Sequence, residues 1–135
     1  MSHLQNKSEV LKDAAGLLHN KNLYPAVAHS AYYSCYQLMK HIWLYSLCKT
    51  ENELAVQSSV QNIGSHEFLI NQISIYIKNS GKRDCDEHFR NFNQKIGQLK
   101  KLRRNADYED ALFDSSKSSS SLSLSTDIIP ILKKY

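Results

Sequence analysis

Residues 25–48 carry apolar side chains at intervals of three and four positions, over the longest such stretch of the chain. Because each residue of an α-helix turns about 100° from the last, these side chains form one stripe. The stripe consists of Val27, Ala31, Cys35, Leu38 and Ile42. Tyr32, Tyr36 and Trp43 widen it on one side, which predicts a long helix in contact with more than one other helix.

Helical spacing recurs in three further long segments, at residues 3–20, 65–80 and 84–104, and in a last stretch at 122–132. The 135 residues include only two prolines and four glycines, too few for the many turns of an all-β fold. We therefore predict one all-α domain over residues 1–135, an up-and-down bundle of four long helices plus a short or interrupted fifth.

Three features interrupt the helical pattern. Residues 113–121 are mostly serine, a poor helix former, and are predicted to be a linker to the last helical segment. Pro130 would break a helix interior, so that last segment is expected to be short or interrupted, with a frayed tail as the alternative. Residues 49–64 are polar and mixed, and are predicted to be loop with some helical turn.

The composition excludes several classes of protein. Three cysteines without a Cys-x-x-Cys spacing argue against a disulfide framework or a zinc site, and the thiols are expected to be reduced. No apolar run approaches the roughly 20 residues that span a bilayer, and the first ten residues lack the apolar core of a signal peptide. We expect a cytoplasmic protein without a membrane partner. With no Gly-rich phosphate loop and no His-Glu-x-x-His motif, we also expect no cofactor and no bound metal.

Positive charge is concentrated before residue 105. The formal net charge is +4, and the cations at positions 95, 100, 101, 103 and 104 lie within ten residues. Arg103 points between the directions of Phe92 and Ile96, inside the apolar stripe of its predicted helix. A guanidinium keeps its charge at neutral pH, so Arg103 needs a partner or a wet interface.

Two interpretations of Arg103 remain open from the residues alone. In the first, the side chain extends to water at the helix end or pairs with Asp107, four residues on. In the second, Arg103 points into a cleft or a subunit interface and meets phosphate. Lys100, Lys101 and Arg104 would then attract the anionic ligand.

The long second helix offers possible companions for Arg103. His29, Tyr33 and Lys40 point in similar directions, on the side away from the apolar stripe. A histidine can transfer protons near pH 7, and a tyrosine can stack on a base. The alternative is that these are ordinary surface residues.

Two segments together resemble the HEPN domain (higher eukaryotes and prokaryotes nucleotide-binding). They are LYPAVAHSAYYSCYQLMKHIW, residues 23–43, and LKKLRRNADYED, residues 99–110. The resemblance extends over residues 5–112 in helix order. It implies a bundle of four or five helices that dimerises, often a toxin or defence factor encoded beside a minimal nucleotidyltransferase. Active members are metal-independent ribonucleases whose arginine and histidine meet their copies across the dimer.

The family motif can be matched residue by residue at the end of the fourth helix. Arg103 corresponds to the motif arginine and Arg104 to the polar residue that follows it. Tyr108 stands where the family has its histidine, in an Ala-Asp-Tyr variant. With a pKa of about 10, a free tyrosine is a poor base at neutral pH.

Three functions are consistent with these residues. The first is a module that binds nucleotide or RNA in a dimer cleft, or a nucleotidyltransferase in a toxin–antitoxin or defence system. Its predicted binding residues are Arg103, Arg104, Asp107, Tyr108, His29, Tyr33, Lys40 and Lys100. The second is a metal-independent ribonuclease in which Tyr108 or His29 replaces the usual histidine beside Arg103. The third is a protein-interaction bundle with Arg103 in a structural salt bridge.

A homodimer is predicted on a separate ground. Tyr32, Tyr36 and Trp43, together with Arg103, offer more apolar and aromatic surface than five short helices are expected to cover.

Overall fold

Six α-helices and one turn of π-helix make up the computed structural model, which describes residues 1–135 and contains no strand. The elements are α1 (His3–Asn20), α2 (Tyr24–His41), η1 (Ile42–Ser46), α3 (Glu51–Val60), α4 (Ser65–Lys78), α5 (Cys85–Tyr108) and α6 (Ser115–Leu132). The predicted all-α bundle is therefore confirmed. None of these helices combines the length and the apolar character that crossing a lipid bilayer requires.

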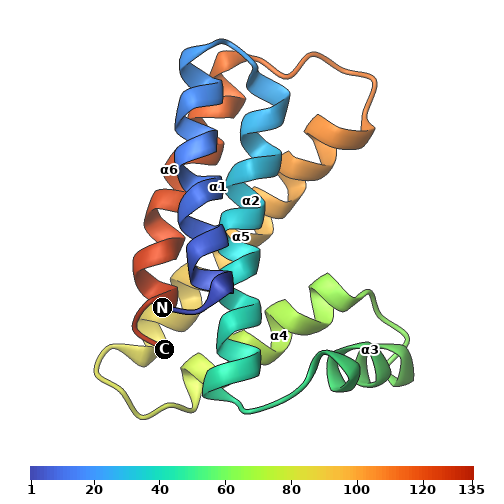
Figure 1. Cartoon of the computed structure of the whole chain (residues 1–135), viewed down its shortest axis with the longest axis vertical. Coiled ribbons are helices and arrows are strands. Elements are labelled where there is room, and N and C mark those ends of the chain that lie inside the picture. Colours follow the sequence, from blue (N-terminus) through green and yellow to red (C-terminus); the bar gives the residue numbers. More distant parts are fainter.

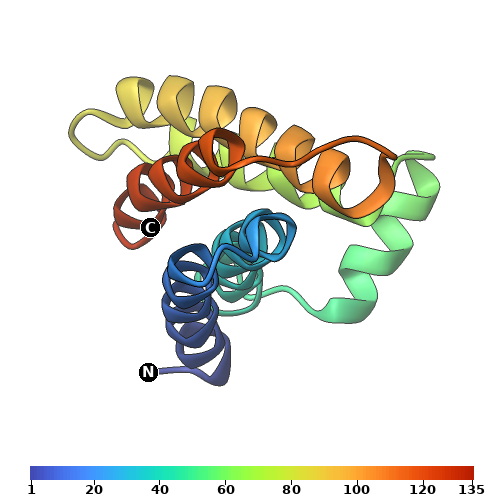
Figure 2. The ribbon, with the colours of Figure 1, turned by 90° about the horizontal axis from the view of Figure 1, so that it is seen from above.

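Helix α2 lies at the centre of the bundle and contacts α1, α4, α5 and α6. Seen from above, α1 and α2 form one layer and α5 and α6 form a second, with α4 below α5 (Figure 2). The α3–α4 pair extends to one side at the lower end of the molecule (Figure 1). This arrangement brings the start of α4 and the last turns of α5 to the same side of α2.

The apolar stripe of α2 is buried as predicted, and so is its aromatic flank. Tyr32 and Trp43 have no exposed surface. The Trp43 ring packs edge-to-face on Phe68 of α4 at 5.9 Å, and its Nε1 donates to the Thr50 carbonyl at 2.8 Å. Helix α4 of the same chain therefore covers this flank. The aromatic surface that suggested a homodimer is thus covered largely within one chain, and the homodimer itself stays a prediction.

Residues 49–64 contain a helix that the sequence pattern did not predict. Helix α3 starts after Thr50, whose Oγ1 accepts from the Glu53 N–H at 3.0 Å and caps the helix. Glu51 and Glu53 lie in its first turn, where negative charge favours the helix dipole. Capping and charge thus form a helix here without a strong apolar stripe.

The predicted linker at 113–121 is wrong, since α6 starts at Ser115 and runs unbroken for 18 residues. The Asp114 side chain caps it by accepting from the Lys117 N–H at 3.0 Å. Ser118 and Ser121 are fully buried, so these small side chains let α6 pack closely on its neighbours. Packing has outweighed the low helix propensity of serine.

Pro130 does not interrupt the last segment, which was expected to be short or interrupted. Pro130 lies in the final turn of α6, two residues before its end at Leu132. Its missing N–H removes one backbone hydrogen bond there, while Ile128, Ile129 and Leu132 are buried in the core. The burial of these side chains holds the turn in helical form.

Candidate functional site

The inward face of α5 changes from apolar to cationic along its length. Phe92, Ile96 and Leu99 are buried, and Arg103 continues the same stripe with only 7% of its surface exposed. The prediction that Arg103 turns inward is confirmed. Helix α5 contacts both α2 and α4, and Arg103 lies in its last two turns, beyond the apolar residues of the core.

Aromatic rings surround the Arg103 guanidinium. Its Cζ lies 4.9 Å from the ring centre of Tyr32, 5.8 Å from that of Tyr33 and 5.7 Å from that of Tyr108. Each such cation–π contact stabilises the cation by about 0.5–2 kcal/mol, depending on how far it is removed from water. The rings hold the charge without using its hydrogen-bond donors.

The hydrogen-bonding capacity of Arg103 is largely unused. Its Nε is buried and has no hydrogen-bond partner. Its Nη1 lies 3.8 Å from Asp107 Oδ2, an ion-pair distance that is too long for a hydrogen bond. A buried donor left without a partner costs about 1–3 kcal/mol, so this arrangement does not serve stability alone.

Asp107 orients a histidine beside the guanidinium. The same Oδ2 that faces Arg103 lies 2.9 Å from His29 Nδ1, while the His29 ring lies 4.7 Å from that of Tyr33. Because a carboxylate only accepts, Nδ1 is the donor in this contact and Nε2 is left for another partner. The predicted residues His29, Tyr33 and Asp107 are therefore brought together at Arg103.

A second histidine, His66, completes the group and was not predicted. It lies in the first turn of α4, with Nδ1 3.0 Å from the Tyr32 hydroxyl oxygen and its ring stacked on Tyr36 at 4.3 Å. Burial lowers the pKa of His66, and the positive charges of Arg103 and Lys100 lower it further. Burial raises the pKa of Tyr32, so its hydroxyl stays protonated. A neutral imidazole thus faces the cation.

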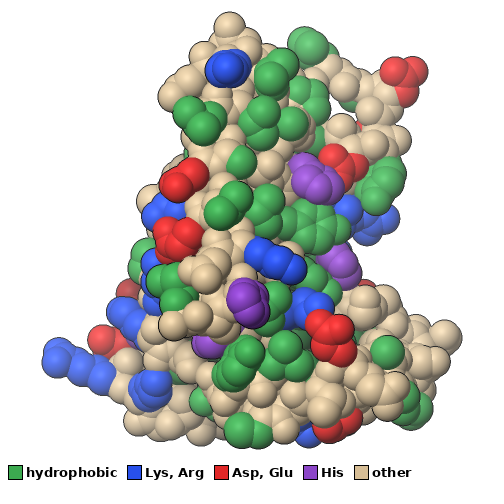
Figure 3. Space-filling view, in the orientation of Figure 1, with side chains coloured by type: hydrophobic (Ala, Val, Ile, Leu, Met, Phe, Trp, Pro, Cys, Tyr) green, Lys and Arg blue, Asp and Glu red, His purple; other side chains and the backbone are tan.

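We call the set formed by Arg103, Asp107, His29, Tyr32, Tyr33 and His66 the Arg103 cluster. In the space-filling view, histidine side chains lie beside acidic and Lys or Arg side chains on the side of the molecule over α2 and α5 (Figure 3). Tyr108 is exposed by 76% and borders the cluster at the last position of α5. Asp107 and Tyr108 therefore belong to the last turn of α5, which extends beyond residue 104, the predicted end of this helix.

Three other predicted residues lie outside the cluster. Lys40 pairs with Glu51 of α3, so its assignment to the Arg103 site stays a prediction without a supporting contact. The helix wheel placed it near His29, but three turns of α2 separate them along the axis. Arg104 is exposed on the outer side of α5, and Lys100 acts on the cluster through its charge.

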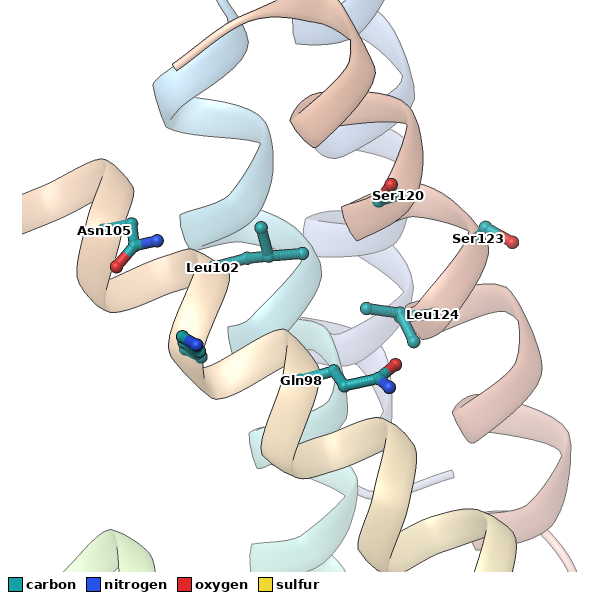
Figure 4. Close-up of a pocket in the computed structure, with 7 residues that line it drawn as sticks. Gln98, Leu102, Asn105, Ser120, Ser123 and Leu124 are labelled. Carbon is teal, nitrogen blue, oxygen red and sulfur yellow. The ribbon is translucent and has the colours of Figure 1, made fainter. Parts of the chain in front are cut away.

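The predicted cleft at Arg103 is not formed by one chain. None of the five pockets of the molecule includes Arg103, because tyrosine rings fill the space around it. Two pockets lie on the other side of α5, one of them between α5 and α6 (Figure 4). No group of three or more His, Cys, Asp or Glu side chains is close enough to hold a metal ion.

Comparisons of this chain with protein-family models, with curated proteins and with solved structures give no match. The resemblance to the HEPN family therefore rests on the two sequence segments that suggested it. What the Arg103 cluster can do chemically follows from its own groups. It offers a cation with free donors, two imidazoles in different environments and aromatic rings at its border.

Proposed function

We propose that this chain binds nucleotide or RNA at the Arg103 cluster. The observation that carries the proposal is the buried Nε of Arg103, which has no hydrogen-bond partner. A phosphate accepts two parallel hydrogen bonds from a guanidinium, and charge-assisted bonds of this kind are stronger than neutral ones. A bound phosphate would supply the acceptors that the folded chain lacks, once the exposed Tyr108 ring beside the guanidinium moves aside to admit it.

The surroundings of Arg103 support a nucleotide better than a simple anion. Tyr33 is half-buried and Tyr108 is exposed, so both rings are available to stack on a base. Lys100, Lys101 and Arg104 raise the positive potential on the same helix, which attracts phosphates from a distance.

Binding of a short fluorescent RNA tests this proposal. We expect Arg103→Lys, which keeps the charge and loses the forked donors, to weaken binding at least about tenfold, or roughly 1.4 kcal/mol. Arg90→Gln removes one exposed cation from the same helix and serves as the matched control. Thermal unfolding of both variants checks that each is folded. Equal binding by the two variants would contradict the proposal.

A ribonuclease is the second candidate, and the His29–Asp107 contact at 2.9 Å favours it. Proton transfer at a ribose 2′-hydroxyl needs a base and an acid near neutral pH, and a neutral His66 beside an oriented His29 would fit these roles better than Tyr108. Labelled RNA incubated in EDTA tests this directly. Cleavage that is lost in His29→Gln and His66→Gln but kept in Tyr108→Phe would establish the activity, and intact RNA in every sample would exclude it.

The proposal also includes the assembly that the family resemblance implies. A second copy of the chain would supply the cleft wall that one chain does not form at Arg103. A minimal nucleotidyltransferase would be the protein partner in a cytoplasmic toxin–antitoxin or defence system. Light scattering tests the homodimer, which a monomeric mass at high protein concentration would contradict. A folded chain that binds neither RNA nor nucleotide would instead be a protein-interaction bundle.

A further inference from the structure

Three cations on the outer side of α5 have no carboxylate partner. Lys100, Lys101 and Arg104 take part in no ion pair, although Lys95 of the same helix pairs with Asp127 of α6 at 2.8 Å. Glu109 is the one acidic residue that lines the first pocket described below, and it accepts from the Asn105 side-chain amide at 2.8 Å when that amide is oriented with its nitrogen toward the carboxylate. The free charges are therefore available to a ligand.

These cations line a groove made of two adjoining pockets. The first pocket, of about 320 Å³, has no hydrophobic lining and is formed by Gly97, Lys100, Lys101, Arg104, Asn105 and Glu109. Apart from its chain neighbours and the backbone of its own helical turns, no atom lies within 4 Å of the place where a Gly97 side chain would start, so the groove is open there. The second pocket shares Lys101 and Asn105 with the first, so the two pockets adjoin at these side chains.

The second pocket combines an apolar base with polar edges. It lies between α5 and α6, has a volume of about 500 Å³ and is lined by Gln98, Lys101, Leu102, Asn105, Ser120, Ser123 and Leu124. Leu102 and Leu124 extend from the two helices into the space between them, and Gln98 and the serines lie around them (Figure 4). An apolar floor with amides and hydroxyls at the edge suits the flat face and polar edges of a base.

The groove and the Arg103 cluster are linked around one helix. Relative to Arg103, the side chains of Lys100, Arg104 and Lys101 are turned by about 60°, 100° and 160° around α5. Lys100 belongs to both regions, since it lines the groove and its charge acts on His66. A helix with its side chains is about 10–12 Å wide, so a strand of a few nucleotides would cross it.

We infer that the groove is a second subsite for single-stranded RNA, which continues from the Arg103 cluster across α5 into the α5–α6 pocket. The inference rests on the proposed function and names its ligand as an oligonucleotide, with one phosphate at Arg103 and a neighbouring phosphate at Lys101 and Arg104. A mononucleotide would occupy only the Arg103 cluster. An acidic protein segment fits less well, because the α5–α6 pocket has the apolar floor and polar rim that suit a base.

A length series tests the inference. The ligands are uridine monophosphate and uridine oligonucleotides of two, four and eight residues, with affinity measured by calorimetry. We expect the tetranucleotide to bind at least about tenfold more tightly than the monophosphate, because a second phosphate and a base gain contacts. Lys101→Gln should remove this gain and weaken monophosphate binding no more than the control Arg90→Gln does. Ser123→Phe, which fills the α5–α6 pocket from an exposed position, should do the same.

The control is Arg90→Gln, which removes the same charge from an exposed position at the other end of α5. The inference is overturned if affinity does not rise with oligonucleotide length. It is also overturned if Lys101→Gln keeps the gain in affinity with length, as Arg90→Gln should. Monophosphate binding that still depends on Arg103 would then leave the proposed function standing. Absence of binding by every ligand, the monophosphate included, would instead refute the proposed function and the second subsite together.

Discussion

Buried polar groups lie on both α5 and α6, and they differ in whether they are satisfied. On α6, Ser118 Oγ lies 2.7 Å from His19 Nδ1, and Ser121 Oγ donates to the Lys117 carbonyl at 2.9 Å. On α5, Arg103 Nε has no partner, alone among the buried side-chain nitrogen and oxygen atoms. The satisfied serines serve packing, whereas the unsatisfied arginine serves stability poorly and is therefore the better candidate for a ligand site.

The largest effect on stability is expected for substitution of a buried serine of α6. Ser118 has no exposed surface, so Ser118→Leu forces a larger side chain between α6 and its neighbours and removes the hydrogen bond with His19. We expect the free energy of unfolding to fall by about 1–3 kcal/mol. Chemical denaturation measures the change.

The neighbouring Ser119 provides the control for this prediction, since it is exposed on the same helix. Ser119→Leu should change the free energy of unfolding by less than about 0.5 kcal/mol. Equal destabilisation by the two variants would mean that the serines of α6 are not there for close packing.

A smaller effect on stability is expected at Arg103. Arg103→Met keeps an apolar stem of similar length, removes the unsatisfied Nε and gives up the cation–π contacts. These changes oppose one another, so the free energy of unfolding should stay within about 1 kcal/mol of the wild-type value. RNA binding should nevertheless be lost. A fall in stability as large as that of Ser118→Leu would show that Arg103 is a structural residue.

The smallest effect is expected in the pH dependence of stability. In the folded chain, burial and the charges of Arg103 and Lys100 lower the pKa of His66, which packs against Tyr32 and Tyr36. In the unfolded chain, the histidine has its ordinary pKa of about 6.5. Between these two values the unfolded chain binds more protons, so stability falls as the pH drops from 7 through about 6.5. His66→Gln should flatten this part of the curve.

His41 contributes with the same sign, because burial and the N-terminal charge lower its pKa as well. His66→Gln should therefore remove part of the slope, and the double variant with His41→Gln should remove more. Denaturation at a series of pH values measures both. A His66→Gln curve that coincides with the wild-type curve would mean that His66 is charged as readily in the folded chain as in the unfolded one.

The parts of the site that lie on regular helices could be predicted from the sequence. The helix wheel predicted that Arg103 points inward and that Asp107, four residues later, lies beside it. Both predictions follow from residue spacing along α5. His29 was also identified as a companion, since α2 has a strong apolar stripe that fixes its orientation. The angle around the helix axis was the weaker guide for Lys40, because it takes no account of the three helical turns that separate Lys40 from His29.

The remainder depends on contacts between helices, which spacing does not encode. His66 has no pattern around it and reaches the cluster only because α4 packs on α2. The serines of α6 predict a linker by propensity, and only burial against neighbouring helices makes them helical. The same contacts covered Trp43 and removed the reason to expect a second copy of the chain there.

The central claim is that a phosphate takes up the free Nε–H of Arg103. Nuclear magnetic resonance of the nitrogen-labelled chain, recorded during titration with uridine monophosphate, observes this group directly. We expect a protected Arg103 Nε–H signal in the free protein that shifts as the nucleotide binds, while the Arg90 signal stays in place. An Arg103 signal that does not move although the nucleotide binds elsewhere would contradict the claim.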